Sequence, residues 1–464
     1  MSLKDKKYLT PRFHLFPKTG WLNDPNGLCQ LDGVHHIFFQ YSPDEPKGGE
    51  KTWGHYSTKD FINYEFSGVF MKPDLPEDAS GVYSGCAYVE DDKMYIYYTG
   101  NVKHAGDYDY ILEGRESNTI LVTSQDGIKA SEKRVLLRSQ DYPDNLTLHV
   151  RDPKVWCQDG VYYMTLGART KNDEGCVILF KSKDKINWDF SHFIEKENFG
   201  YMWECPDLFY VDGKQFLSIS PQGLEAKEYS FQNIYQSGYF NSKRDLLADG
   251  KGLGEFTEWD YGFDFYAPQT YVDEKGRTIL IAWMGMPDAE YGHDVSIEDG
   301  WQHMLSIPRE LTYDSKSGKI LQQPIAEIKE LRDKKIDIRD IADVESYELN
   351  LAGFDQNDFI IQFNKGFDVK YSKLRNDLVF SFTDKNLGSN RTTRKLKLAD
   401  GERVENMKIY VDTCSIEIFI NDGIYTYTTK YFKAKDVKNS ISLEGSIDNI
   451  EAYSLKPFNV DFIQ

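Results

Sequence analysis

Several features that define other classes of protein are scarce or absent in this sequence. Its six cysteines include no closely spaced pair, which excludes the cysteine motifs of structural zinc sites and thioredoxin-like centres. No stretch reaches the roughly 18 consecutive apolar residues that a membrane-spanning helix needs. Positive charge is in the minority, because 55 Lys and Arg residues stand against 74 Asp and Glu residues, for a formal net charge of -19. Such a chain is poorly suited to nucleic acids or anionic membranes, which favour clustered positive charge.

These absences leave a small polar molecule as the expected partner. No metal-binding or cofactor-binding motif is present, so neither a metal nor a cofactor is expected. The polar residues 1–7 lack the apolar core of a secretory signal, which predicts a cytoplasmic location. The sequence gives no indication of an oligomeric state. Aromatic residues, by contrast, are abundant, with 31 Tyr and 28 Phe, and these favour β-strands.

One pattern recurs five times in residues 1–320. Each copy has a polar cluster, a short apolar strand, an acidic turn and then a strand rich in aromatic and branched residues. The turns are Asp32-Gly33, Asp91-Asp92, Asp159-Gly160, Asp212-Gly213 and Asp273-Glu274. Each interval holds about four short strands, which is the content of one propeller blade. The pattern predicts a five-bladed β-propeller whose polar clusters meet at one rim of the central channel.

The character of the chain changes after residue 320. Residues 321–336 contain a short amphipathic stretch and are interpreted as a linker. Residues 337–464 alternate polar and apolar residues in strand after strand, and Asn421-Asp422-Gly423 is typical of a hairpin turn. This part is predicted to be an antiparallel β-sandwich with a scaffolding role. The predicted fold class is therefore all-β throughout.

Three of the polar clusters carry an acid, namely Asp24, Asp152 and Glu204. Retaining hydrolysis of a glycosidic bond needs one carboxylate to attack and one carboxylic acid to protonate the leaving oxygen. Asp24 lies among polar residues that would keep it ionised, as a nucleophile requires. Glu204 is flanked by aromatic and apolar residues that would raise its pKa, as a general acid requires. Arg151 is expected to hold Asp152 charged, so that it stabilises developing positive charge.

The runs at 21–27 (WLNDPNG), 151–153 (RDP) and 204–207 (ECPD) resemble the three signature motifs of glycoside hydrolase family 32, the invertase and fructanase family. The resemblance extends to 415–423 (SIEIFINDG), which is similar to a run in that family's sandwich. It implies a five-bladed propeller with a carboxy-terminal sandwich, and a retaining β-fructofuranosidase. It also implies that Asp24 is the nucleophile, Asp152 the transition-state stabiliser and Glu204 the acid/base.

The resemblance further implies a set of substrate-binding residues. They are Trp21, Asn23, Gln40, Trp53, Tyr83, Ser84, Arg151, Asp260, Asp264, Tyr266 and Trp283. Which of Asp260 and Asp264 faces the pocket stays open. Two departures from the family pattern are present: residues 44–50 replace an additional Trp-Gly-Asn, and Cys86 replaces the second serine of the common Ser-Gly-Ser.

The run at 300–311 (GWQHMLSIPREL) resembles bacterial family members that hydrolyse sucrose 6-phosphate. Sucrose 6-phosphate and sucrose are therefore the expected substrates, with His303 and neighbouring basic residues at the end that binds the leaving group. Exo-hydrolysis of short fructo-oligosaccharides would use the same three acids. Two other classes stay open: a catalytically silent sugar-binding propeller, and an inverting glycosidase whose carboxyls lie about 6.5 to 9.5 Å apart.

Overall fold

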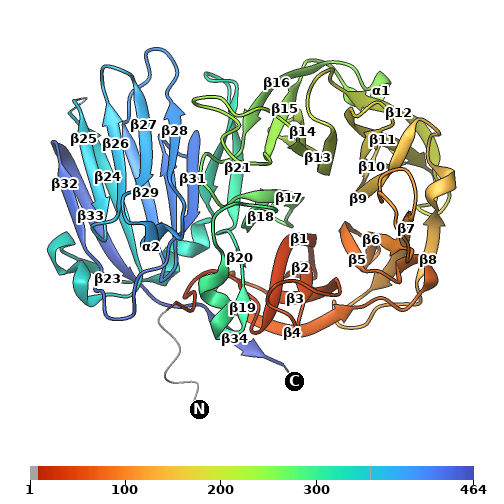
Figure 1. The fold of residues 1–464 in the computed structure, drawn as a ribbon, viewed down its shortest axis with the longest axis horizontal. Coiled ribbons are helices and arrows are strands. Elements are labelled where there is room, and N and C mark those ends of the chain that lie inside the picture. Colours follow the sequence, from red (N-terminus) through yellow and green to blue (C-terminus); the bar gives the residue numbers. More distant parts are fainter. Residues whose placement is uncertain (1–8, 356, 464) are drawn as a thin grey trace.

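The computed structural model describes residues 9–355 and 357–463, and the all-β prediction is confirmed. Figure 1 shows β-sheets arranged in a ring, with two further sheets stacked beside it. Within the described residues, α-helix is confined to single turns at α1 (Leu246–Asp249) and α2 (Lys385–Gly388). None of their helices has the length and apolar character needed to cross a membrane. Short 3-10 helices complete the structure: η2 (Pro76–Asp78), η3 (Ser139–Asp141), η4 (Asp294–Asp299), η5 (Ala326–Leu331) and η6 (Ile338–Asp343).

The ring contains five sheets, formed in chain order by the described residues. The first has β1 (Gly20–Leu31), β2 (Val34–Ser42), β3 (Thr52–Thr58) and β4 (Asn63–Met71), extended by β19 (Trp301–Gln302) and β34 (Asn459–Phe462). The second has β5 (Val82–Glu90), β6 (Lys93–Lys103), β7 (Arg115–Ser124) and β8 (Arg134–Leu137). The third has β9 (Leu146–Gln158), β10 (Val161–Thr170), β11 (Gly175–Ser182) and β12 (Asp189–Glu195).

The remaining two sheets of the ring follow the same antiparallel order. The fourth has β13 (Met202–Val211), β14 (Lys214–Gln222), β15 (Gly238–Ser242) and β16 (Leu253–Glu258). The fifth has β17 (Tyr266–Val272), β18 (Thr278–Met284), β21 (Arg309–Asp314) and β22 (Lys319–Pro324), with β20 (Met304–Leu305) also paired to β18. In Figure 1 the first strand of every sheet lies nearest the centre of the ring.

The stacked pair of sheets forms a β-sandwich. One sheet has the order β23 (Arg332–Ile336), β33 (Ile447–Leu455), β24 (Tyr347–Phe354), β29 (Asn406–Val411), β30 (Ser415–Ile420) and β31 (Tyr425–Lys430). The other has the order β28 (Thr393–Lys397), β27 (Asp377–Phe382), β26 (Phe367–Ser372), β25 (Phe359–Phe363) and β32 (Ile441–Glu444). Phe380 and Tyr427 stack between the two sheets with ring centroids 4.0 Å apart.

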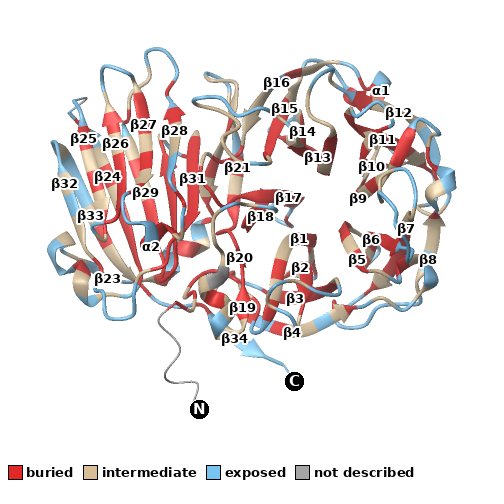
Figure 2. Cartoon of the chain, viewed as in Figure 1, coloured by how far each residue is buried: buried red, intermediate tan, exposed pale blue. Residues whose placement is uncertain are grey.

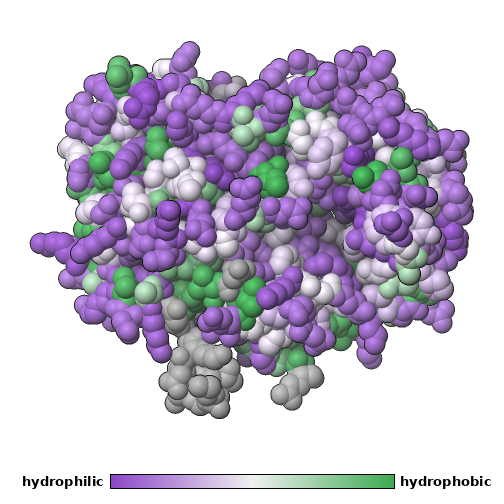
Figure 3. Space-filling model, in the orientation of Figure 1, coloured by the Kyte–Doolittle hydropathy of each residue, from purple (hydrophilic) through white to green (hydrophobic). Residues whose placement is uncertain are grey.

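Aromatic and branched side chains fill the spaces between neighbouring sheets. Figure 2 shows the strands mostly buried and the connecting loops mostly exposed. Trp53 of the first sheet meets Tyr98 of the second at 6.3 Å between ring centroids, and both are buried. Each large apolar side chain buried in this way contributes roughly 1.5 to 3 kcal/mol. On the face in Figure 3, the described apolar residues form small separate patches on a mostly hydrophilic surface. That face therefore presents no broad apolar area of the kind that marks a protein interface.

The first strand of each ring sheet is interrupted by a β-bulge at its polar cluster. The pairing register shifts between residues 22 and 25, 82 and 85, 151 and 154, 204 and 207, and 266 and 269. Prolines in or beside four of these bulges cannot donate a hydrogen bond to the neighbouring strand, which favours the interruption. A bulge changes the direction in which local side chains point. Five bulges at equivalent positions therefore direct five polar clusters to the same end of the ring.

The strand β34 leaves the sandwich and joins the first sheet of the ring. It pairs in parallel with β4, with Asn459 opposite Asn63 and Phe462 opposite Phe66. The rings of Phe462 and Phe66 lie 5.6 Å apart. The outer edge of the first sheet is thus covered by residues from the far end of the described chain.

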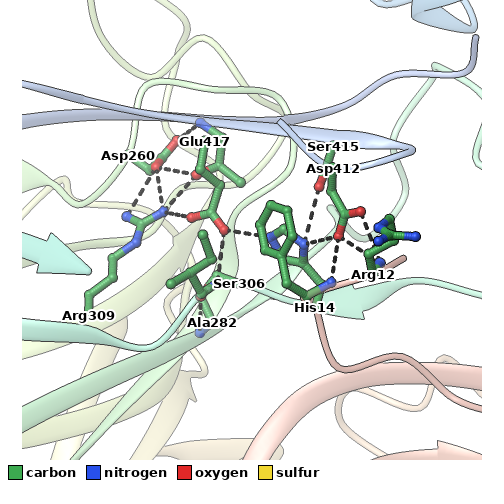
Figure 4. Close-up of polar contacts among 12 residues, drawn as sticks. Arg12, His14, Asp260, Ala282, Ser306, Arg309, Asp412, Ser415 and Glu417 are labelled. Carbon is green, nitrogen blue, oxygen red and sulfur yellow. Dashed lines mark hydrogen bonds and ion pairs between the residues drawn. The ribbon is translucent and has the colours of Figure 1, made fainter. Parts of the chain in front are cut away.

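A buried polar network joins the amino-terminal segment, the fifth sheet and the sandwich (Figure 4). Arg309 forms ion pairs with Asp260 at 3.2 Å and with Glu417 at 2.6 Å. The two ring nitrogens of His14 contact Asp412 at 2.8 Å and Glu417 at 3.0 Å. Buried charges are costly unless they are paired and hydrogen-bonded, and here each charged group faces an opposite one. The contribution of the network to holding the sandwich against the ring therefore depends on the charges of its members.

The charge of His14 makes this contribution dependent on pH. Burial disfavours the protonated ring, but hydrogen bonds and charges from Asp412 and Glu417 outweigh burial and raise the pKa of His14 from 6.5 to about 9. Because the pKa is raised in the folded state, the stabilisation is fully present below about pH 6.5 and is lost as the pH rises through about 9.

We expect His14→Gln to lower the free energy of unfolding by about 3 kcal/mol near pH 6, because it removes the charged partner of buried Asp412 and one of the two charged partners of buried Glu417. The difference from the unsubstituted protein should shrink toward pH 10, as measured by urea unfolding across a pH series. His104→Gln is the matched control, since His104 forms an exposed pair with Glu116 and should cost less than about 1 kcal/mol. A stability difference for His14→Gln that stays constant with pH would contradict the assignment.

Candidate active site

The five polar clusters meet in a cavity of about 400 Å³ at one end of the ring. Its lining comes from the first strands of all five sheets and from adjoining segments. The lining residues are Trp21, Asn23, Asp24, Gln40, Lys51, Tyr83, Ser84, Arg115, His149, Arg151, Asp152, Glu204, Cys205, Gln222, Tyr235, Tyr266, Trp283, Pro287 and Asp288. The structure therefore brings together the three acids that the sequence singled out, although Asp24 and Glu204 are 180 residues apart in the chain.

Asp24 lies in the bulge of β1, between two hydrogen-bond donors. Ser84 Oγ donates to Asp24 Oδ2 at 2.6 Å, and Asn23 Nδ2 donates to Asp24 Oδ1 at 3.1 Å. Polar neighbours of this kind are the donors predicted to favour its ionised form. Instead burial raises the pKa of Asp24, and the two hydrogen bonds oppose that rise only in part. A carboxylate with a raised pKa binds a proton, or an electrophilic carbon, more readily than an ordinary aspartate does.

Asp152 lies in the bulge of β9 with a backbone φ of 63°, in the left-handed region that aspartate tolerates better than most residues. Its own N–H donates to Thr99 Oγ1 at 3.0 Å, and the N–H of Cys205 donates to Asp152 Oδ2 at 2.9 Å. Burial, with the nearby charges of Glu204 and Asp24, raises the pKa of Asp152 to about 7, although Arg151 opposes the rise. One hydrogen bond to the carboxyl and one from the backbone of the same residue therefore hold Asp152 in the lining of the cavity.

Glu204 is held by donors on both of its oxygens. Arg151 Nε and Nη2 donate to Oε1 at 3.0 and 2.8 Å, while Gln222 Nε2 and Tyr266 OH donate to Oε2 at 2.7 and 2.6 Å. Two expectations are corrected here. Arg151 pairs with Glu204 and not with Asp152, and the apolar neighbours of Glu204 do not surround its carboxyl. Alternation along β13 turns Trp203 into the core instead, where its exposure is 0%.

Most of the predicted substrate-binding residues line the cavity. Those that do are Trp21, Asn23, Gln40, Tyr83, Ser84, Arg151, Tyr266 and Trp283. Trp21 and Trp283 form one aromatic wall, with ring centroids 6.1 Å apart. Trp21 Nε1 donates to Asn23 Oδ1 at 2.8 Å, which orients the amide beside Asp24. The wall offers an apolar face and the opposite side offers charged groups, as a cavity for a sugar requires.

Three predicted substrate-binding residues lie outside the cavity. Trp53 is completely buried between sheets and donates to the carbonyl of Tyr83 at 3.0 Å, so it supports the cavity from behind. Asp260 belongs to the network of Figure 4. Asp264 accepts two 2.8 Å hydrogen bonds from Arg391. Both aspartates lie outside the cavity because the loop before β17 runs along β31 of the sandwich and is hydrogen-bonded to that strand.

The prediction that His303 lines the cavity is also wrong. Its exposure is 1%, and its ring lies behind the aromatic wall, 4.4 Å from that of Trp21 and 5.0 Å from that of Trp283. Arg309, considered with it, is completely buried in the network of Figure 4. The basic residues at the cavity are different ones.

Sequence reasoning missed Lys51, Arg115, His149, Gln222, Tyr235 and Asp288 in the lining. His149 could have been found, because it lies two residues before Arg151 and alternation places both on one face of β9. No local sequence pattern marks Arg115, because it begins the third strand of its sheet and the recurring polar clusters belong to the first strands. Among the described residues, no group of three or more His, Cys, Asp or Glu side chains is arranged to hold a metal ion.

Comparison with known proteins identifies two adjoining regions. Residues 14–324 match the family described as "Glycosyl hydrolases family 32 N-terminal domain", and residues 323–454 match "Glycosyl hydrolases family 32 C terminal". A sucrose-6-phosphate hydrolase of Bacillus subtilis is 39% identical, over 90% of this chain and 88% of the relative. A sucrose-6-phosphate hydrolase of Vibrio alginolyticus is 38% identical, over 96% and 90%.

Solved structures show the same similarity across both parts of the chain. The sucrose-6-phosphate hydrolase of Lactobacillus gasseri has a TM-score of 0.85 at 26% identity, covering 98% of this chain and 94% of that one. A Bombyx mori β-fructofuranosidase mutant in complex with sucrose has a TM-score of 0.83 at 28% identity, covering 98% of this chain and 95% of that one.

Proposed function

The chain belongs to glycosyl hydrolase family 32, and from that premise we propose that it is a retaining β-fructofuranosidase acting on sucrose 6-phosphate and sucrose. The observation that carries the proposal is the meeting of Asp24, Asp152 and Glu204 in one cavity of suitable size for a disaccharide. The names of the relatives, which include several sucrose-6-phosphate hydrolases, support the phosphorylated substrate. Since sucrose 6-phosphate is an intracellular metabolite, a cytoplasmic location forms part of the proposal.

The proposed reaction has two steps. Asp24 attacks the anomeric carbon of the fructosyl unit, the bond to the glucosyl oxygen breaks with its electron pair, and that oxygen takes a proton from Glu204. A water molecule then gives a proton to Glu204 and attacks the same carbon, which releases fructose and restores Asp24. Asp152 accepts hydrogen bonds from fructosyl hydroxyls and stabilises the positive charge that develops on the ring.

The substrate contacts are proposed from the lining of the cavity. Trp21 and Trp283 pack against the sugar, and polar side chains around Asp24 bind fructosyl hydroxyls. The full proposed set is Trp21, Asn23, Gln40, Tyr83, Ser84, Arg151, Tyr266 and Trp283.

The domain organisation is part of the same proposal. The five ring sheets are taken as the five blades of a catalytic propeller over residues 1–320, of which residues 1–8 lie outside the described part. Residues 321–336 connect it to the sandwich at 337–464, of which residues 356 and 464 lie outside that part. In the structure β22 extends the fifth sheet to Pro324 and β23 already belongs to the sandwich from Arg332, so the stretch that connects the two parts, 325–331, lies within the proposed linker and is shorter than it.

The experiment compares kcat/KM for sucrose, sucrose 6-phosphate and a short inulin oligomer. We expect the phosphorylated disaccharide to be preferred over sucrose by at least about tenfold, which one charge-assisted contact would supply. Reaction in dilute methanol should yield methyl β-D-fructofuranoside, because retention preserves the β configuration. The α product would instead indicate an inverting enzyme. Absence of fructose release from all three sugars would indicate a silent sugar-binding propeller.

A further inference from the structure

We propose that Arg115, His149 and Arg151 form an anion subsite that binds the phosphate monoester on the glucosyl unit of the substrate. The proposal rests on the proposed function and deepens it by assigning the residues that read the phosphate. It follows from the geometry, the charge and the position of this cluster within the cavity.

The three side chains come from two neighbouring sheets and touch one another. Arg115 begins β7, and His149 and Arg151 project from the same face of β9. Arg151 Nη1 lies 2.9 Å from His149 Nδ1, and Arg115 Nη1 lies 3.1 Å from His149 Nε2. Burial, followed by the charges of Arg151 and Arg115, lowers the pKa of His149 to about 2. The imidazole is therefore a neutral spacer between two guanidinium groups at neutral pH.

One of the two cations of the cluster has no carboxylate partner among the described residues. Arg151 is paired with Glu204, but Arg115 forms no ion pair within the described residues, and its Nε is buried there without a hydrogen-bond partner. Lys103 lies opposite Arg115 in the ladder between β6 and β7, and burial with the charges of Arg115 and Arg151 lowers the pKa of Lys103. Unbalanced cations are unusual in a chain with a net charge of -19. A bound anion would relieve both their repulsion and the unpartnered donor.

The cluster lies on the side of the cavity from which the glucosyl unit departs. In a displacement at the anomeric carbon, the nucleophile and the leaving group occupy opposite sides of that carbon. Glu204, which protonates the leaving oxygen in the proposed mechanism, is hydrogen-bonded directly to Arg151. A guanidinium presents paired donors that match the oxygens of a phosphate.

The other cation in the lining is already engaged. Lys51 Nζ donates to Asn23 Oδ1 at 3.2 Å and lies 4.9 Å from the centre of the Trp21 ring. Burial lowers the pKa of Lys51 to about 8, and the charge of Asp24 opposes that decrease. Lys51 thus belongs to the side of the nucleophile. The unsatisfied positive charge lies with Arg115.

The test compares the ratio of kcat/KM on sucrose 6-phosphate to kcat/KM on sucrose in one preparation of each variant. This ratio does not depend on the fraction of protein that is folded. We expect Arg115→Gln to lower it by roughly 10- to 100-fold, because one charge-assisted contact to the phosphate is lost. Arg115→Lys keeps the charge without the paired donors, so its ratio should lie between those of Gln and Arg.

Arg169→Gln is the matched control. This substitution also removes one positive charge near His149. Because Arg169 pairs with Asp173 and does not line the cavity, the ratio of the two kcat/KM values should change by less than about threefold. Glucose 6-phosphate should inhibit the unsubstituted enzyme more strongly than glucose does, and Arg115→Gln should reduce this difference.

The outcomes separate this inference from the proposed function. If the unsubstituted enzyme prefers sucrose 6-phosphate and Arg115→Gln keeps that preference, the subsite is assigned wrongly and the proposed function stands. If the unsubstituted enzyme treats the two disaccharides equally, the phosphorylated substrate and the subsite both fail. If Arg169→Gln and Arg115→Gln lower the kcat/KM ratio equally, the preference for the phosphorylated substrate comes from long-range charge and not from a subsite.

Discussion

Replacing Asp24 with asparagine should lower kcat on sucrose by roughly 10⁵-fold or more, with substrate binding largely retained. Asparagine keeps the size and shape of aspartate but has no negative oxygen to attack the anomeric carbon, so no covalent fructosyl intermediate forms. Losses of this size are typical when the nucleophile of a covalent mechanism is removed. The loss should be the same for good and poor leaving groups, because both depend on the same attack.

Steady-state kinetics on sucrose and on p-nitrophenyl β-D-fructofuranoside provide the measurement, with and without added azide. Azide should not restore the Asp24→Asn variant, because the amide still fills the space that the anion would need. Asp32→Asn is the matched control, since Asp32 is exposed in the turn between β1 and β2 and its φ of 52° is tolerated by asparagine. Restoration of Asp24→Asn by azide with fructosyl azide of the β configuration would show that another group makes the first attack, because azide acting in place of Asp24 would give the α configuration.

Replacing Glu204 with glutamine should have a different signature. Loss of general acid catalysis should lower kcat/KM on sucrose by about 10² to 10⁴-fold. The nitrophenyl leaving group departs without a proton, so the first step should largely recover with that substrate. The second step needs Glu204 as a base toward water, so it should remain slow and the fructosyl enzyme should accumulate.

Mass spectrometry of digests from the Glu204→Gln variant should detect the fructosyl group on the peptide that contains Asp24. Azide needs no base, so it should accelerate turnover of this variant and give fructosyl azide with the β configuration. Glu195→Gln, at the exposed end of β12, is the control and should retain ordinary kinetics. If azide fails to accelerate Glu204→Gln, the acid/base role is assigned to the wrong residue.

The convergence of the acids could be predicted from sequence because it depends on a repeated local signal. Polar residues recur near the bulge in the first strand of each ring sheet, with prolines at four of the five, and each bulge forms at that local pattern. Asp24, Asp152 and Glu204 therefore line one cavity, as the phase of the repeats predicted. The match of the Asn-Asp-Pro and Arg-Asp-Pro runs to a known family added the expected chemistry.

The surroundings of these acids could not be predicted in the same way. Arg151 and Glu204 are 53 residues apart and meet because two sheets pack side by side, which no local pattern reveals. Asp260 and Asp264 lie within an aromatic run that was predicted to be part of the cavity. They bind the sandwich instead, because their loop lies against β31, and only the packing of the two parts determines that.

The pairing of β34 with β4 has a consequence for how the protein is made. Asn459 and Asn63 are hydrogen-bonded across 396 residues of chain. At 5 to 20 residues per second, a ribosome takes roughly 20 to 80 s to synthesise that interval. During this time β4 presents an open strand edge, which is prone to pair with other nascent chains. The growing polypeptide therefore carries an uncovered strand edge until β34 has been synthesised.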